Sequence, residues 1–208
     1  MSINYGLAPE NPYPIAVEDC YAGIKWISEN TEELGIDARQ IMIGGTSAGG
    51  GLAVGTALLC RDNKGPALFA MCLKCPMLDD RELTMSRRQY AENKTWNQQH
   101  NTFGWGSYLG KQYQGPDVSI YAAPGRADDL SGLPEAFLDA GSAELFRDEV
   151  VAFASKLWAS GVQAELHIWP GVYHGSETTA PAAAVSRVAR ETRMGWMERT
   201  FARKADTT

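Results

Sequence analysis

Apolar positions along the chain change their spacing several times, and each change predicts a boundary between elements. Residues 14–30 carry apolar side chains at the spacing of an amphipathic helix. The short apolar run at 40–43 predicts a strand. The stretch GGGLAVGTALLC, at residues 49–60, is apolar on nearly every side. We therefore expect the first half of the chain to contain a surface helix, a strand and a buried helix.

The second half repeats the alternation of strand and helix. Strands are predicted at 67–75, 135–140 and 163–169, and helices at about 147–160 and 180–203. The first of these helices would turn four side chains inward: Val150, Phe153, Ala154 and Leu157. Strands that alternate with helices predict a mainly parallel sheet covered by helices on both faces. In such sheets, functional groups gather at the carboxyl ends of the strands.

Residues 82–130 have no sustained period and predict short helices and loops. Four aromatic residues of this segment either wall a pocket or anchor poorly packed chain, and both interpretations stay open: Trp96, Phe103, Trp105 and Tyr108. The sequence shows no internal repeat and no linker. We expect one domain over residues 1–208, with 82–130 as a partly irregular cap or pocket segment.

Composition narrows the class of protein. The chain has 208 residues, of which 44% are hydrophobic and 21% charged, as in ordinary globular proteins. Its net charge of −6 disfavours nucleic acid and anionic membranes as partners, because both require a basic surface. No apolar run approaches the roughly 20 residues that cross a bilayer, and the first residues do not resemble a signal peptide. We expect a cytoplasmic protein.

Four cysteines are present, at positions 20, 60, 72 and 75. Cys72 and Cys75 form a C-x-x-C pair, but this pair lies in a predicted buried strand, where a spacing of three sends the side chains to opposite faces. Redox pairs normally open a helix, and no second Cys/His pair completes a zinc site. We expect free thiols that pack as small apolar groups.

The stretch GGTSAGGG, at residues 44–51, lies where the predicted strand gives way to the predicted helix. Its central residues, Gly45 to Gly49, fit the G-x-S-x-G pattern of a nucleophile elbow around Ser47. The alternative is a glycine-rich turn with an idle hydroxyl. A base and an acid at neighbouring strand ends would decide between the two, because serine is a weak nucleophile without an adjacent base.

Histidine is the usual base near neutral pH, and the chain has three. His100 falls in the irregular segment, and His167 lies in the middle of a predicted strand. His174, in PGVYHGSE, follows a predicted strand in a loop, which makes it the candidate base.

The acid is expected between the serine and the histidine in chain order. The stretch FLDAGSAELFRDEV offers four carboxylates. Asp139 is still in the strand, and Asp148 and Glu149 occupy a first helical turn, where acids are common because of the helix dipole. Glu144 lies in the loop between strand and helix, so it is the candidate acid.

Four stretches together resemble the hormone-sensitive-lipase-like branch of the α/β-hydrolase family: YGLAPENPYPIAVEDCYAGIKW, GGTSAGG, GLPEAFLDAGSAELFRDE and WPGVYHG. The resemblance implies an α/β-hydrolase fold and a carboxylic-ester hydrolase for short acyl esters that uses neither a metal nor an organic cofactor. By position, Ser47 matches the nucleophile, His174 the base and Glu144 the acid. The backbone N–H of Ala48 would donate to the oxyanion.

The sequence departs from the family pattern in three ways. Thr46 stands where the family usually has aspartate, and glutamate occupies an acid position that is often aspartate. The His-Gly-Gly-Gly loop that completes the oxyanion hole is not in the sequence. By resemblance, the N-terminal strands and that loop are absent, and a gap is expected beside the strand that carries the elbow. We expect such an open edge to be covered by homo-oligomerisation.

Two classes of function follow. The first is an esterase in which Ser47, His174 and Glu144 act as a catalytic triad on a small-molecule ester. The second is a non-catalytic or impaired hydrolase-like protein that binds a ligand or a partner. The intact set of three residues favours the first class, and the missing oxyanion loop favours the second.

Overall fold

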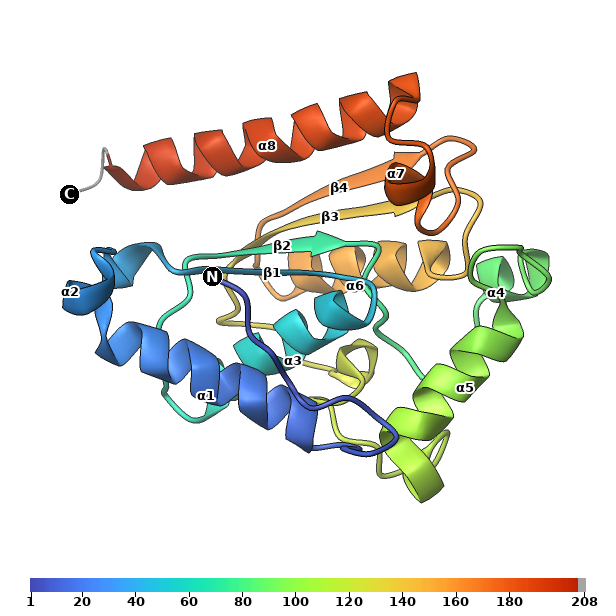
Figure 1. Ribbon diagram of the computed structural model, residues 1–208, viewed down its shortest axis with the longest axis horizontal. Helices are drawn as coiled ribbons and strands as arrows, with labels where there is room; N and C mark the ends of the chain where they lie inside the picture. Colours follow the sequence, from blue (N-terminus) through green and yellow to red (C-terminus); the bar gives the residue numbers. More distant parts are fainter. Residues whose placement is uncertain (206–208) are drawn as a thin grey trace.

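A four-stranded parallel sheet forms the centre of the computed structural model, which describes residues 1–205 (Figure 1). The strands lie side by side in chain order: β1 (Met42–Thr46), β2 (Ala70–Lys74), β3 (Glu135–Gly141) and β4 (Ala164–Trp169). Each pair of neighbours is parallel. All four carboxyl ends therefore meet at one edge of the sheet.

Helices cover both faces of the sheet. On one face lie α3 (Ala48–Asp62) and α6 (Arg147–Ala159), and α1 (Ile15–Glu29) packs against α3. The other face is covered by α8 (Ala184–Ala205) (Figure 1). The predicted parallel sheet with helices on both faces is confirmed. The four apolar residues expected to face inward from α6 are all buried.

The sheet divides its side chains between two apolar layers because successive residues of a strand point to opposite faces. Met71, Leu73 and Leu138 are fully buried in the layer with α3 and α6. Ala70 and Phe137 point the other way, where they meet Trp196 of α8. Full burial of one large apolar side chain stabilises the fold by about 1.5–3 kcal/mol, so both layers contribute substantially.

Two element boundaries differ from the sequence-based prediction. The strand expected at 40–43 begins at Met42 and continues to Thr46, because residues Ala38–Gln40 form a 3₁₀ turn (η1) that is capped by Asp37. The helix expected at 180–203 is α8, which begins later, at Ala184, and a separate short helix, α7 (Ser176–Thr179), precedes it. Pro181 lies between the two, and proline does not fit a helix interior.

The remaining elements are short. Besides α2 (Thr31–Leu34), all of them lie in the predicted irregular segment 82–130: α4 (Met85–Gln89), α5 (Gln98–Leu109), η2 (Gly110–Gln112) and η3 (Pro124–Arg126). The helices α4 and α5 lie beyond the carboxyl edge of the sheet (Figure 1). Short helices and loops were the prediction for this segment, and they are confirmed.

No helix within residues 1–205 combines the length and the apolar character needed to cross a membrane.

One edge of the sheet is open on the side of β1. Among the described residues, β1 pairs only with β2. A cleft of about 720 Å³ lies along its outer edge, between β1 and residues 1–3. The gap expected beside the elbow strand is therefore present.

The hydrogen bonds between β1 and β2 show which backbone N–H and C=O groups of β1 face this cleft. Ile41 accepts a hydrogen bond from Phe69, and Ser47 donates one to Lys74, so these two residues turn their backbone groups toward β2. The direction alternates from residue to residue along a strand. The backbone groups of Met42, Gly44 and Thr46 consequently point to the open edge.

Candidate active site

Ser47 lies at the sharp turn between β1 and α3. Its backbone angles are φ 57° and ψ −121°, a strained conformation for a residue with a side chain. The Ser47 N–H donates to the Lys74 carbonyl at 2.9 Å, and the Ser47 carbonyl accepts from the Gly50 N–H at 2.9 Å. A Cβ at Gly45 would lie 2.1 Å from the carbonyl oxygen of Gly49, so only glycine fits there. The strand and the helix thus hold the serine hydroxyl out at the carboxyl edge.

His174 reaches this hydroxyl from the loop after β4. Its Nε2 lies 3.0 Å from Oγ of Ser47, and its Nδ1 lies 2.5 Å from Oε2 of Glu144. Phe146 contacts the imidazole edge-on at 5.1 Å between ring centroids, and Trp96 lies at 6.0 Å. The ring is therefore held between a hydroxyl and a carboxylate, with apolar rings beside it.

Glu144 lies in the turn between β3 and α6 and is only 1% exposed. Its second oxygen, Oε1, accepts the Gly141 N–H at 2.5 Å. Gly141 also packs closely against the loop that leads to His174. A Cβ on Gly141 would lie 2.0 Å from the Val172 carbonyl oxygen in that loop. Both carboxylate oxygens thus face donors, which suits an ionised acceptor.

The other carboxylates considered from the sequence bind elsewhere. Asp148 accepts from the Ser86 N–H at 2.7 Å. Asp139 pairs with Arg193 at 2.9 Å on the α8 side of the sheet. Glu149 accepts from the Leu78 N–H at 2.9 Å, and burial raises its pKa well above the usual value despite that bond.

The other two histidines have neighbours other than Ser47. His100 is in the first turn of α5, and the His167 ring lies 2.9 Å from Glu165 in β4 and stacks on Trp169. The structure thus brings together the three residues selected from the sequence, Ser47, Glu144 and His174.

A cavity of about 190 Å³ opens beside Ser47 and Ala48. Ala48 is the first residue of α3, where a backbone N–H has no partner within the helix. Three of the four aromatic residues of the irregular segment line the cavity, Trp96, Trp105 and Tyr108, whereas Phe103 is 71% exposed. Residues 5–8 complete the lining, a role that their sequence pattern did not indicate.

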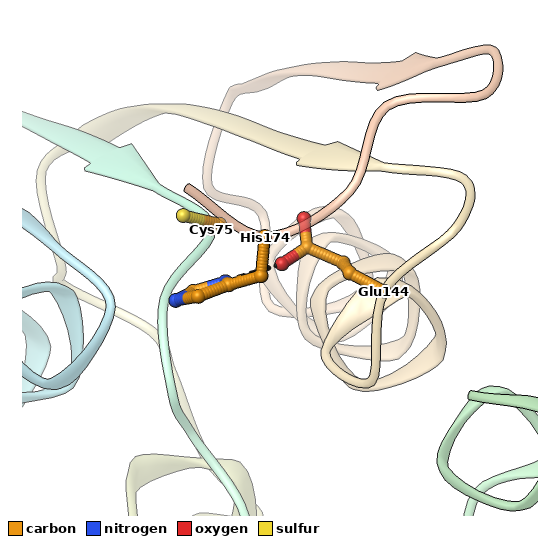
Figure 2. Close-up of side chains that lie close together, drawn as sticks. All are labelled: Cys75, Glu144 and His174. Atoms are coloured by element: carbon orange, nitrogen blue, oxygen red, sulfur yellow. Dashed lines mark hydrogen bonds and ion pairs between the residues drawn. The ribbon is translucent and has the colours of Figure 1, made fainter. Parts of the chain in front are cut away.

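Cys75 lies beside the triad, a position that the sequence reasoning did not predict. It follows β2 directly, with a φ of 36°, and its ligand atom lies within 4.8 Å of those of Glu144 and His174 (Figure 2). Burial raises the pKa of its thiol well above the usual value, so the thiol is neutral. One feature of the sequence could have indicated this position of Cys75: it follows a strand, as Ser47, Glu144 and His174 do.

The four cysteines are free thiols, as expected. Because β2 ends at Lys74, Cys75 lies beyond the strand and the alternation of strand faces does not decide its direction.

Comparisons with known proteins find matches over most of the chain. A family model described as "alpha/beta hydrolase fold" matches residues 1–178. The chain is 36% identical over 195 residues to carboxylesterase NlhH of Mycobacterium tuberculosis, a match that covers 88% of this chain and 59% of that protein.

Solved structures are similar over nearly the whole chain. A bacterial heroin esterase superposes with a TM-score of 0.92 at 42% identity, which covers 95% of this chain and 63% of the other. Esterase LipW from Mycobacterium marinum gives a TM-score of 0.89 at 34% identity, and the match covers 95% of this chain and 62% of LipW. The chain thus spans about three fifths of the length of these relatives.

Proposed function

The chain belongs to the alpha/beta hydrolase fold family, in its hormone-sensitive-lipase-like branch, and from that premise we propose that it hydrolyses carboxylic esters. The single observation that carries the proposal is the continuous hydrogen-bonded chain from Ser47 through His174 to Glu144. A buried acid that orients a base beside a strained serine is the arrangement that serine hydrolases need. The cytoplasm stays the predicted location.

Under this proposal each group has one role. Ser47 Oγ attacks the ester carbonyl while Nε2 of His174 takes the hydroxyl proton. Glu144 holds the Nδ1–H and stabilises the imidazolium that forms. The proton then passes to the leaving alkoxide, and a water molecule, activated by the same imidazole, hydrolyses the acyl-enzyme. The N–H of Ala48 at the start of α3 donates to the oxyanion.

The cavity favours small esters with short acyl chains. Its volume of about 190 Å³ is below the range of roughly 300–1,000 Å³ that is typical of sites for drug-sized ligands. Its lining is mainly apolar and includes the side chains of Leu52, Met77 and Trp96. An acetyl or butyryl group fits this description, whereas a long acyl chain does not.

We expect the chain to act much better on activated esters than on alkyl esters. Loss of one oxyanion donor costs about 10²–10³-fold in turnover, and the sequence supplies Ala48 but no His-Gly-Gly-Gly loop. A good leaving group such as p-nitrophenolate depends less on the missing donors. Steady-state kinetics on p-nitrophenyl butyrate and ethyl butyrate measure the difference. Rates typical of the family on both esters would show that another group completes the oxyanion hole.

A non-catalytic binding protein is the second candidate, because the sequence has no His-Gly-Gly-Gly loop. Reaction with a small fluorophosphonate, followed by peptide mass spectrometry, separates the two candidates. An activated Ser47 gives a single phosphonyl adduct on its own peptide. An unmodified Ser47 under conditions that label a reference serine hydrolase would favour the binding protein.

We also propose that the chain self-associates through the open edge of β1. Exposed Met42, Gly44 and Thr46 backbone groups form a template for a strand from a second copy. We expect light scattering to show a dimer or a larger oligomer at micromolar concentration. Met42→Pro, which removes an N–H from this edge, should shift the protein toward monomer. The preceding residue, Ile41, already has the extended angles that proline requires.

The matched control for this experiment is Met42→Ala, which removes the same side chain but keeps the N–H. It should associate as the unmodified chain does. A stable monomer of the unmodified chain at these concentrations would contradict the proposal.

A further inference from the structure

Three potential metal ligands of different chemistry meet at the carboxyl edge of the sheet. Cys75 comes from the end of β2, Glu144 from the turn after β3 and His174 from the loop after β4. Their ligand atoms all lie within 4.8 Å of one another, and Figure 2 shows the three side chains close together, with the carboxylate bonded to the imidazole. The triad uses only two of the three groups, and the thiol has no part in it.

We propose that Cys75, Glu144 and His174 form an inhibitory binding site for a zinc-like divalent cation. A thiolate, an imidazole nitrogen and a carboxylate are the three ligand types that Zn²⁺ takes in proteins. Three protein ligands leave the fourth tetrahedral position to water, as in other zinc sites that are open to solvent. Mg²⁺ and Ca²⁺ prefer a larger set of oxygen ligands, so they are not the matching ions.

The charge of the ligand set suits a divalent cation. A thiolate and a carboxylate together neutralise its two positive charges, which matters because Cys75 is 5% and Glu144 is 1% exposed. A hollow of about 20 Å³, which Cys75 and Glu144 line and His174 does not, lies next to the cluster and exceeds the roughly 10–15 Å³ that one water molecule needs. Lys74 also borders the hollow, but its ammonium is paired with Glu177 at 3.2 Å.

Binding of the cation is incompatible with a working triad. The thiol of Cys75 gives up its proton to solvent as the metal–sulfur bond forms, and the imidazole binds in its neutral form. Bond lengths of about 2.0–2.3 Å place tetrahedral ligand atoms roughly 3.4 Å apart. In the structure, Nδ1 of His174 and Oε2 of Glu144 are 2.5 Å apart. Coordination would therefore move the base away from its acid. The inhibitory half of this inference rests on the proposed esterase function, whereas binding does not.

Binding is tested first with Cd²⁺, whose bond to a thiolate gives an ultraviolet charge-transfer band. We expect one equivalent of Cd²⁺ to produce this band in the unmodified chain, with release of one proton. Cys75→Ala and Cys75→Ser should both lack the band. Cys72→Ala, which removes a half-buried thiol three residues earlier, is the matched control and should keep it. A band that survives in both Cys75 variants, or no band in the unmodified chain, would overturn the site.

Inhibition is tested with Zn²⁺ on p-nitrophenyl butyrate hydrolysis, with each variant compared with its own metal-free rate. We expect Zn²⁺ to inhibit the unmodified chain reversibly, with recovery on addition of EDTA, and Mg²⁺ to have no effect. The half-inhibitory Zn²⁺ concentration should rise at least about tenfold in Cys75→Ser. Equal inhibition of both proteins, or Cd²⁺ binding without loss of activity, would overturn the inhibitory role. A chain that binds Cd²⁺ but is inactive without metal would contradict the esterase function alone.

Discussion

Replacement of Ser47 by alanine will reduce ester hydrolysis by several orders of magnitude, up to about 10⁶-fold, because loss of a triad serine has an effect of this size. His174 Nε2 then has no hydroxyl at 3.0 Å to activate, and no second nucleophile within residues 1–205 bonds to that nitrogen. The substitution keeps the Cβ of Ser47, so the strain of its positive φ is unchanged and the fold is retained. Steady-state hydrolysis of p-nitrophenyl acetate measures the loss.

The control for this experiment is Ser155→Ala. Ser155 lies on α6, where its hydroxyl bonds only to the Val151 carbonyl within the same helix. We expect this variant to keep the turnover and the thermal midpoint of the unmodified chain. Turnover by Ser47→Ala close to that of the unmodified chain would remove Ser47 from the role of nucleophile.

The sequence predicts this site well because its parts are local. The G-x-S-x-G stretch defines a strand-to-helix turn within a few residues, and Gly45 is required by a contact with Gly49 only four positions away. Glu144 and His174 each follow a strand that the apolar pattern already indicates. Once the sheet is parallel, the carboxyl ends converge, and the three side chains meet without further assumptions.

The parts that the sequence does not predict depend on contacts between distant segments. Nothing in the pattern around Cys75 distinguishes a packed thiol from one beside a triad, because its neighbours come from the turns after β3 and β4. The short helix α7 is another case. Glu177 in this helix pairs with Arg193 at 2.7 Å and with Lys74 at 3.2 Å, so it is fixed by α8 and β2 rather than by its own four residues.

Replacement of Glu144 by glutamine will reduce kcat by about 10⁴-fold, as expected when a triad acid becomes an amide. The carboxylate accepts from two donors, the Gly141 N–H at Oε1 and His174 at Oε2. An amide has one acceptor oxygen, so its NH₂ must face one of these donors. If it faces His174, the imidazole takes the tautomer with the proton on Nε2, which cannot accept the proton of Ser47. If it faces Gly141, two donors collide and His174 loses its charged partner.

Asp148→Asn is the matched control, because it makes the same change from carboxylate to amide four residues later. Asp148 accepts from the Ser86 N–H and pairs with Arg147 at 2.7 Å, away from the imidazole. An asparagine oxygen still accepts from Ser86, and loss of a charge in a first helical turn costs at most about 1 kcal/mol of stability. We expect near-normal kcat for Asp148→Asn and a lowered thermal midpoint of a few degrees at most. The reverse order of the two kcat values would show that Asp148, and not Glu144, is the acid that supports His174.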